Sequence, residues 1–522
     1  MISAIYHLVR LARAGWVLAH EGVFSSVDPT MVPPAARLPL AMAKLIARRR
    51  LAPGGSRLAA AMGRLGPSYV KLGQFLATRP DVVGPNVVRE LEQLQDRVPP
   101  FPQDEAVQII EAAFGRPIGE VFTEFGPSVA AASIAQVHKA RVRDVDGNEH
   151  DVAVKVLRRG VERRFARDLS DMYFAARFAE RHFSEARRLR MTEVVDTLAR
   201  SVRMEMDFRL EAAAASEFGE NCAKDTDFRV PTVDWDRTAK DVFTLEWIDG
   251  TPLTDLDAIA ARGIDLRDLG RTIIQSFLRH AVRDGFFHAD MHQGNLFVDM
   301  KGELVAVDFG IMGRLGHKER RFLAEILYGF ITRDYRRVAE VHFEAGYVPD
   351  THKVEDFAQA IRAIGEPIHS RTADQISMAK LLTLLFEITA LFDMRTRTEL
   401  VLLQKTMVVV EGVARKLDPR LDMWSTADPV VRSWIEANLG PRGMLADAGR
   451  GLAAIGRNVR ELPELFDRAE RVARRLEEAA QHGFSLSPAS VEAIGLAEAR
   501  RARWGNAALW VIALTLLGFF LL

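Results

Sequence analysis

The sequence is poor in cysteine: among its 522 residues only Cys222 carries a thiol. A single cysteine excludes a disulfide within the chain and is typical of proteins that work in a reducing compartment. We expect Cys222 to be a packing residue rather than a nucleophile.

An excess of one charge sign is also missing. The chain has 70 Lys and Arg residues against 70 Asp and Glu residues, so its formal net charge is zero. Domains that bind nucleic acid usually show a basic excess, and we expect no nucleic-acid partner. The sequence contains no GxxxxGK[ST] motif either, which excludes the P-loop NTPases.

What the chain does contain is a dense set of polar residues in the stretch FFHADMHQGNLFVDMKGELVAVDFG. Asp290 is followed by Asn295, then by a hairpin pattern, and then by Asp308 within Asp-Phe-Gly. In protein-kinase-like sites this order supplies an Asp that orients the acceptor hydroxyl or water, and an Asn and a second Asp that hold Mg²⁺ against the phosphates. The sequence therefore predicts Mg-ATP binding, with Asp290 as the catalytic residue and Asn295 and Asp308 as metal ligands.

The spacing in this stretch has a mechanical reason. Leu296–Val298 and Leu304–Val307 are patterned as two short strands joined by a turn. A tight hairpin brings its ends together, so Asn295 and Asp308 can face the same ions. Carboxylate and amide oxygens suit Mg²⁺.

Two other interpretations of this stretch remain open. One is an ordinary polar hairpin that contains Asp-Phe-Gly by coincidence. The other takes His288 and His292 as metal ligands spaced four apart on a helix. The absence of HExxH and the glycine at Gly294 favour a loop over that helix.

A nucleotide site of this kind also needs a lysine upstream. The segment His150–Leu157 alternates as a strand and places Lys155 in a Val-Ala-Val-Lys setting. In kinase-like sites this lysine contacts the α- and β-phosphates and pairs with a glutamate on a small-lobe helix. Alone, the pattern is equally that of a surface strand with one lysine, and its place upstream of Asp290 favours the nucleotide role.

The glycine-rich loop that usually covers the phosphates is missing, because no GxGxxG precedes Lys155. Small residues let backbone N–H groups approach phosphates closely. We interpret an alanine-rich turn as a modified phosphate-covering loop, with a packing turn between strands as the alternative. The turn residues are Ala130, Ala131, Ala132 and Ser133.

With two further motifs, the chain resembles the UbiB (AarF/ADCK) family of atypical kinases. These are KLGQ, which holds Lys71 and Gln74, and EMDFRLEA, which holds Glu205, Asp207 and Glu211. Ordinary kinases have neither KxGQ nor the alanine-rich loop, so the conjunction of all the motifs is specific to this family.

The resemblance implies roles for the matching positions around the nucleotide. Lys155 would be the nucleotide lysine and Glu211 its helix partner. Glu246 lies in LEWIDG, where kinases have the hinge that borders the adenine.

The resemblance also implies an N-terminal extension that folds over the place where a protein substrate lies in a kinase. Lys71 and Gln74 would belong to it, and Glu205 and Asp207 would contact it. Such an extension leaves ATP hydrolysis, or transfer to a small or lipid acceptor, as the expected activity. From the residues alone, Lys71 and Gln74 share one helical face, whereas Glu205 and Asp207 diverge unless the backbone bends. Charged surface helices are the alternative for both pairs.

The fold we expect is α+β, an atypical protein-kinase-like two-lobed fold with helical additions. No Ala-Pro-Glu follows Asp-Phe-Gly, so the usual activation segment is absent or remodelled. The expected divisions are amphipathic N-terminal helices (1–60), the KxGQ extension (61–115), an N-lobe (116–250), a C-lobe (251–365), a C-terminal helical region (366–502) and a transmembrane anchor (503–522). The N-terminal helices either lie on a membrane surface or dock on the core; we favour docking.

The C-terminus predicts a membrane anchor. Ala507–Leu522 has no charged residue, and a helix extended back to Trp504 would be about 28 Å long, close to the roughly 30 Å of a hydrocarbon core. Arg500, Arg501 and Arg503 precede it, and the positive-inside rule then leaves the catalytic domain in the cytoplasm. We expect a bacterial inner-membrane protein with a single C-terminal span. The alternative is a helix docked on the soluble domain or on a second copy.

The resemblance implies a membrane-anchored kinase-like ATPase that supports ubiquinone biosynthesis, with ATP and Mg²⁺ as cofactors. The implied partners are membrane lipids, quinone precursors and ubiquinone-biosynthesis enzymes, and a homodimer is a further candidate. A true phosphotransferase with a protein or lipid acceptor is one alternative. A non-catalytic nucleotide-binding scaffold is the other, and the complete set of active-site residues argues against it.

Overall fold

A computed structural model describes residues 2–26, 34–48, 56–77, 83–91, 94, 99–144, 146–368, 387–389, 391–394 and 398–440. Contacts group the chain into two compact units, Met1–Ile435 and Glu436–Leu522. Apart from residues 436–439 at the end of the last described helix, the elements described below belong to the first unit.

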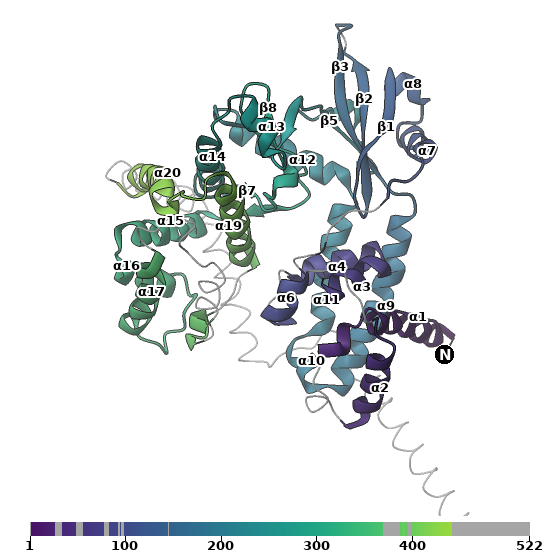
Figure 1. The fold of residues 1–522 in the computed structure, drawn as a ribbon, viewed down its shortest axis with the longest axis horizontal. Helices are drawn as coiled ribbons and strands as arrows, with labels where there is room; N and C mark the ends of the chain where they lie inside the picture. The colour runs from purple at the N-terminus through teal and green to yellow at the C-terminus, as the bar shows by residue number, and fades with distance from the viewer. Residues whose placement is uncertain are drawn as a thin grey trace, which may run out of the picture. The chain divides into compact units, whose positions relative to one another are not determined.

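The N-lobe is built on an antiparallel four-stranded sheet in the order β1-β2-β3-β5 (Figure 1). On β3, Val152, Val154 and Val156 are buried against α7 and α8. Alternate residues of a strand face opposite sides, so Lys155 projects from the other face of the sheet. The bounds are β1 Glu124–Ala131, β2 Ala135–Arg143, β3 Glu149–Leu157, β5 Val242–Glu246, α7 Gln103–Phe114 and α8 Ile118–Val121.

Along the chain, helices α9, α10 and α11 lie between β3 and α12, the helix that carries Glu211. On α9 the side chains Phe165, Leu169 and Met172 are buried at i, i+4 and i+7, the spacing of a one-sided apolar stripe. The bounds are α9 Val161–His182, α10 Ser184–Arg188, α11 Met191–Glu205 and α12 Phe208–Cys222.

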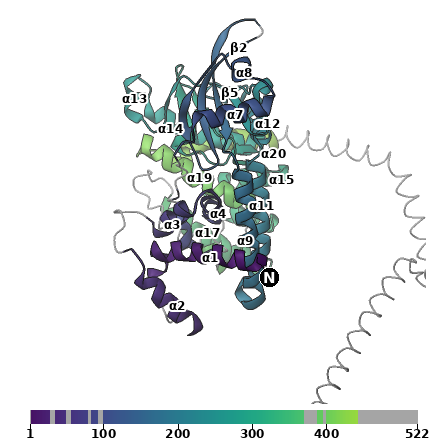
Figure 2. The same cartoon turned by 90° about the vertical axis from the view of Figure 1, so that its right-hand side faces the viewer.

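The N-terminal helices pack on α9 and α11, and Figures 1 and 2 show α1 crossing α9. Arg10 Nη2 lies 2.6 Å from Asp168 Oδ1, and His7 Nδ1 lies 2.7 Å from Asp171 Oδ1. Ser68 Oγ donates to Asp168 Oδ2 at 2.7 Å. Docking of the first helix is therefore confirmed. The bounds are α1 Ile2–His20, η1 Val23–Ser26, α2 Pro34–Leu45, α3 Arg57–Leu65, α4 Pro67–Ala77 and α6 Pro85–Leu91.

The C-lobe is mainly helical and holds a small sheet in the order β4-β9-β8-β6, beside the pair β7-β10. The predicted hairpin is confirmed, because β8 and β9 pair antiparallel with Leu296 opposite Ala306. The strands are β4 Phe228–Arg229, β6 Gly250–Pro252, β7 Phe286–His288, β8 Leu296–Asp299, β9 Leu304–Ala306 and β10 Met312–Arg314. The helical segments are η3 Trp235–Arg237, α13 Leu256–Ala261, α14 Leu266–Arg279, the π-turn η4 His280–Asp284, η5 Gln293–Asn295, α15 His317–Thr332, α16 Tyr335–Glu344, α17 Val354–Ile368, α19 Thr398–Leu417 and α20 Met423–Leu439.

An aromatic cluster joins α12 to the catalytic hairpin. The fully buried ring of Phe218, on α12, lies 5.8 Å from Phe228, 6.1 Å from Phe286 and 6.2 Å from Phe309 between ring centroids. Phe309 is the phenylalanine of Asp-Phe-Gly. The cluster therefore fixes α12 relative to the adjacent aspartate.

Three further expectations can be compared with the fold. Asp-Phe-Gly is followed by residues 311–316, which include β10, and then directly by α15, as expected for a remodelled activation segment. Cys222 is buried, and burial raises the pKa of its thiol, which fits a packing residue. In the part of the chain that the structure describes, no helix is long and apolar enough to cross a membrane. The expected anchor, residues 503–522, lies outside that part.

Candidate functional site

The centre of the site is a three-residue ionic cluster formed by β3, α12 and the Asp-Phe-Gly turn. Lys155 Nζ donates to Glu211 Oε1 at 2.7 Å and to Asp308 Oδ1 at 3.2 Å. The ammonium also lies 5.4 Å from the ring centroid of Phe208. We call Lys155, Glu211 and Asp308 the lysine cluster. The structure brings together residues that are far apart in the sequence, as the kinase-like interpretation requires.

Charge and burial act in opposite directions within the lysine cluster. The adjacent ammonium of Lys155 holds the pKa of Asp308 well below its usual range. Burial disfavours the charged amine, but the two carboxylates outweigh it and raise the pKa of Lys155. Burial raises the pKa of Glu211 from 4.5 to about 7, against the opposing effect of Lys155. Glu211 is therefore the member of the cluster that titrates near neutral pH.

Glu211 should make the stability of the protein depend on pH. Because the pKa in the folded state exceeds the unfolded value of 4.5, the folded chain binds more protons between pH 4.5 and 7. The contribution of Glu211 is full below that window and falls as pH rises through it. The free energy of unfolding should drop by up to about 3 kcal/mol over the window relative to Glu211→Gln, measured by urea unfolding. Equal pH slopes in the two proteins would contradict this expectation.

The loop after β7 carries Asp290 and leads into Asn295, which directly precedes β8 of the hairpin. Asn295 is buried, and its Nδ2 donates to the backbone oxygen of Asp290 at 3.1 Å. The backbone N–H of Val307 donates to the backbone oxygen of Asn295 at 2.8 Å. The hairpin thus holds Asn295 next to the strand that leads into Asp308.

The two histidines of this loop have structural roles in the described geometry. His288 is buried, its Nδ1 accepts from the backbone N–H of Asp290 at 3.1 Å, and burial lowers its pKa. His292 Nδ1 accepts from the N–H of Gly294 at 3.0 Å and caps the short η5 turn. The loop is not the helix that a four-residue histidine spacing would need, so the structure disfavours the alternative metal site.

Elsewhere, the described residues contain one group of potential metal ligands, Cys222, Asp225 and His280. Its carboxylate is already bound by arginine: Arg283 Nη1 lies 2.6 Å and Arg279 Nε 3.4 Å from Asp225 oxygens. Two guanidinium groups oppose a further cation, so this group is a buried hydrogen-bonded cluster.

The residues at the hairpin ends fit a magnesium ion. Asp308 offers a carboxylate, and Asn295 keeps its amide oxygen while its nitrogen donates to the loop. Mg²⁺ prefers such oxygen ligands. Asp308 already accepts a cationic partner, Lys155, which shows that its surroundings favour positive charge. The donor set is the one the sequence predicts.

The KxGQ segment lies on α4 and reaches toward this site. Lys71 Nζ lies 2.7 Å from Glu205 Oε2, and the charge of Lys71 helps to lower the pKa of Asp308. Gln74 is partly buried on the same helix, one turn further on.

The two members of the ExD pair diverge because the helix breaks between them. Glu205 ends α11 and faces Lys71, whereas Asp207 caps α12. The carboxylate of Asp207 accepts from the backbone and the guanidinium of Arg209. Glu205 therefore makes the link to α4, and Asp207 starts the helix that carries Glu211.

The alanine-rich segment forms the tight connection between β1 and β2. Ala130 and Ala131 end β1, opposite Val137 and Gln136 of β2. The residues that follow close the turn: the N–H of Ala132 donates to Ala135 O at 2.8 Å. Ser133 is fully buried in the turn. Arg158 Nε donates to Ala132 O at 3.2 Å, which anchors the turn to the end of β3.

Glu246 lies at the end of β5, and its side chain is engaged within the protein. Its carboxylate lies 2.9 Å from Arg229 Nη1 and accepts from Thr232 Oγ1 at 3.0 Å. Its backbone N–H donates to Thr232 O at 2.9 Å. These contacts fix the end of β5, where the chain crosses from the N-lobe to the C-lobe.

Sequence reasoning missed a brace from α19 to the catalytic loop. Thr406, fully buried on α19, donates to the backbone oxygen of Ala289 at 2.9 Å. Lys416 Nζ donates to Gln293 Oε1 at 2.9 Å. The only sequence signal is a threonine on the apolar side of a helix, which is too common to predict such a contact.

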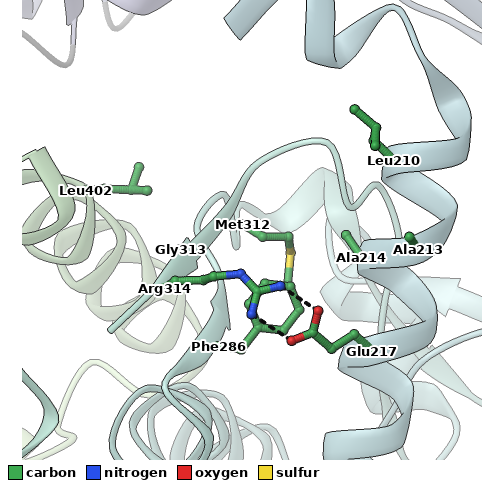
Figure 3. Close-up of a pocket in the computed structure, with 9 residues that line it drawn as sticks. All are labelled: Leu210, Ala213, Ala214, Glu217, Phe286, Met312, Gly313, Arg314 and Leu402. Atoms are coloured by element: carbon green, nitrogen blue, oxygen red, sulfur yellow. Dashed lines mark hydrogen bonds and ion pairs between the residues drawn. The ribbon is translucent and has the colours of Figure 1, made fainter. Parts of the chain in front are cut away.

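Sequence reasoning also missed an apolar pocket on the side of α12 that faces β10 and α19. It has a volume of about 470 Å³. Figure 3 shows Glu217 and Arg314 paired across it, with Arg314 Nη1 2.7 Å from Glu217 Oε1. The pocket is lined by one side of α12, whereas Glu211 extends from a different side of the same helix toward Lys155. Its lining residues are Leu210, Ala213, Ala214, Glu217, Phe286, Met312, Gly313, Arg314 and Leu402.

Two protein-family models match the sequence of this chain. The ABC1 atypical kinase-like domain matches residues 93–342, and the UbiB helical domain matches residues 361–422. The second match includes the whole of α19, the helix that braces the catalytic loop.

Two curated relatives span most of the chain. A protein of Marinobacter nauticus named probable protein kinase UbiB is 39% identical over 468 residues, which cover 88% of this chain and 84% of the relative. A protein of the same name from Pseudomonas putida is 38% identical over 433 residues, which cover 82% of this chain and 78% of the relative. A solved complex of Rv3197 with erythromycin from Mycobacterium tuberculosis aligns with a TM-score of 0.48 and 25% identity over 70% of this chain and 93% of that chain.

Proposed function

Because this chain belongs to the UbiB family of atypical kinase-like proteins, we propose that it binds Mg-ATP at the lysine cluster and uses it in support of ubiquinone biosynthesis. The contact of Lys155 with both Glu211 and Asp308 carries the proposal. It joins the sheet of the N-lobe, the adjacent helix and the Asp-Phe-Gly turn, as a working kinase-like site requires.

Each side chain has a defined task in this proposal. Lys155 binds the α- and β-phosphates and is kept in place by Glu211. Asp308 and Asn295 hold Mg²⁺, which when bound neutralises phosphate charge. Asp290 orients the attacking oxygen. The alanine-rich turn at 130–133 covers the phosphates, and Glu246 borders the adenine.

The extension on α4 decides the acceptor. Lys71 is held by Glu205 at 2.7 Å and lies close enough to lower the pKa of Asp308. We propose that Lys71 and Gln74 exclude protein substrates, so that the γ-phosphate passes to water or to a small or lipid acceptor. The protein is then an ATPase or a phosphotransferase of restricted access.

We further propose that residues 503–522 anchor the protein in the bacterial inner membrane, with the catalytic domain on the cytoplasmic side. We also propose that the domain boundaries lie near residues 60, 115, 250 and 365, as the sequence predicts. Membrane lipids, quinone precursors and ubiquinone-biosynthesis enzymes are the proposed partners, and a homodimer is a further one. Polyprenyl quinone precursors are strongly apolar, and ATP-driven motion at the bilayer surface would expose them to soluble enzymes.

The first test follows the γ-phosphate. Full-length protein in anionic liposomes receives γ-labelled ATP, with Asp290→Asn as the control. If the wild-type protein releases free labelled phosphate and the Asp290→Asn variant does not, the protein is an ATPase. If the label appears on a lipid or a protein, it is a phosphotransferase. ATP turnover that is equal in both proteins would refute the role of Asp290. Unchanged quinone levels in cells that lack the protein would refute the pathway.

A further inference from the structure

On the face that points away from the protein, helix α1 exposes large apolar side chains around a single charged residue, Arg13. Its inner face holds His7 and Arg10 against α9. The outer face carries Tyr6, Val9 and Trp16, which are 67%, 63% and 51% exposed. These three recur at i, i+3 and i+10, so they lie on one side of the helix. An amphipathic helix docked on a core normally turns charged residues outward.

Helix α2 and the residues just after it repeat this pattern. Leu38, Met42 and Leu45 lie at i, i+4 and i+7, and Leu45 is 85% exposed. The two helices lie next to one another in both views (Figures 1 and 2). The N–H of Arg48 donates to His20 O at 2.8 Å and ties their ends together. Eight of the 17 large apolar side chains exposed in the described residues belong to residues 6–46.

The same segment is strongly basic. Residues 1–60 contain eight Lys or Arg residues and two acidic ones, although the whole chain is neutral. One of the acids, Glu21, is buried and bound by Arg64 and Arg48. The apolar residues are therefore accompanied by a local excess of positive charge.

We propose that the outer faces of α1 and α2 form a membrane-binding surface that lies in the headgroup region of an anionic bilayer. Helices of this kind place apolar side chains at the acyl boundary and basic side chains among the headgroups. Tyr6 and Trp16 are the residue types enriched at that boundary. This surface would add a second contact to the proposed membrane association. It does not depend on the segment 503–522 or on the phosphate chemistry.

Charge favours an anionic bilayer over a second copy of the chain as the partner of this surface. Two copies that met through these faces would bring two basic segments together, which is repulsive. An anionic bilayer attracts the same segment. A surface that binds lipid would also hold α9 and α11 in a fixed orientation to the bilayer, because α1 is bonded to α9 through Asp168 and Asp171.

The test is a fluorescent label at single positions of the full-length protein. The single cysteine, Cys222, is buried, so an introduced cysteine is the one that reacts. Val9→Cys and Met42→Cys carry the environment-sensitive dye NBD, and Met300→Cys is the matched control, since Met300 is an exposed methionine on the β8–β9 turn. The vesicles are phosphatidylcholine with or without phosphatidylglycerol, and they contain lipids spin-labelled near the headgroup.

With phosphatidylglycerol present, the emission at positions 9 and 42 should shift to the blue, rise severalfold and be quenched by the spin label, while position 300 stays unchanged. If the protein floats with the vesicles but positions 9 and 42 behave like position 300, this inference fails and the proposed anchoring stands. If the protein does not float, both fail. Equal shifts without phosphatidylglycerol would overturn the assignment to anionic lipid. A shift in buffer alone that grows with protein concentration would assign the face to a second copy.

Discussion

Replacing Asp308 with asparagine should reduce the release of γ-phosphate from Mg-ATP by at least about 100-fold, since losing even one preorganised hydrogen-bond donor costs an active site that much. Asparagine keeps the shape of the side chain but removes the charge that Mg²⁺ needs. The low pKa of Asp308 means that the lost group is a carboxylate at every physiological pH. The measurement is steady-state release of labelled phosphate by full-length protein in liposomes.

The fold should survive this change, so the loss can be assigned to the site. Asp308 has φ 67°, in the left-handed region that asparagine also tolerates. Lys155 keeps Glu211 as a partner at 2.7 Å. Asp257→Asn is the matched control, because Asp257 is an exposed aspartate in the first turn of α13. If both variants released phosphate at the wild-type rate, Asp308 would not hold the metal and the proposed function would need another site.

Phe218→Ala should lower the free energy of unfolding by about 3–5 kcal/mol, the usual cost of emptying a buried phenylalanine site. Phe218 is fully buried. Its ring lies within about 6 Å of those of Phe228, Phe286 and Phe309, and 4.9 Å from that of His280. Because these neighbouring rings come from β4, β7, the Asp-Phe-Gly turn and η4, neighbouring side chains cannot fill the cavity without moving several elements. Urea unfolding measures the change.

Two further variants test whether the loss of stability comes from the buried volume of Phe218. Phe218→Leu keeps most of the volume and should cost less than half as much. Phe183→Ala removes a phenylalanine that is 53% exposed and should change stability by no more than about 0.5 kcal/mol. A similar loss in Phe218→Ala and Phe183→Ala would mean that the aromatic cluster does not hold α12 to the hairpin.

Local patterns in the sequence predicted the parts of the site that depend on short-range geometry. The alternation around Lys155 and the apolar pairs around Asp299–Gly302 predicted β3 and the β8–β9 hairpin, because strand faces and turns are set by neighbouring residues. The helical spacing around Lys71 predicted α4 for the same reason.

The parts that depend on packing between distant segments could not be predicted. Thr406 is more than one hundred positions from Ala289, which accepts its hydrogen bond, and no motif marks either residue. The sequence indicated that Glu205 and Asp207 would diverge on a helix, but not that the helix would end between them. That break follows from a cap at Asp207, and an aspartate two residues before an arginine is too common to predict it.

The left-handed backbone at Asp308 has a consequence for attempts to make this protein withstand heat. An L side chain at such a φ costs roughly 1 kcal/mol that glycine avoids. Glycine at this position would relax the turn and delete the carboxylate together. Backbone strain and the proposed ATP chemistry therefore favour different residues at this position. A screen that scores heat resistance alone registers the relaxed turn and the lost ion pair with Lys155, but it does not register the loss of the proposed metal ligand.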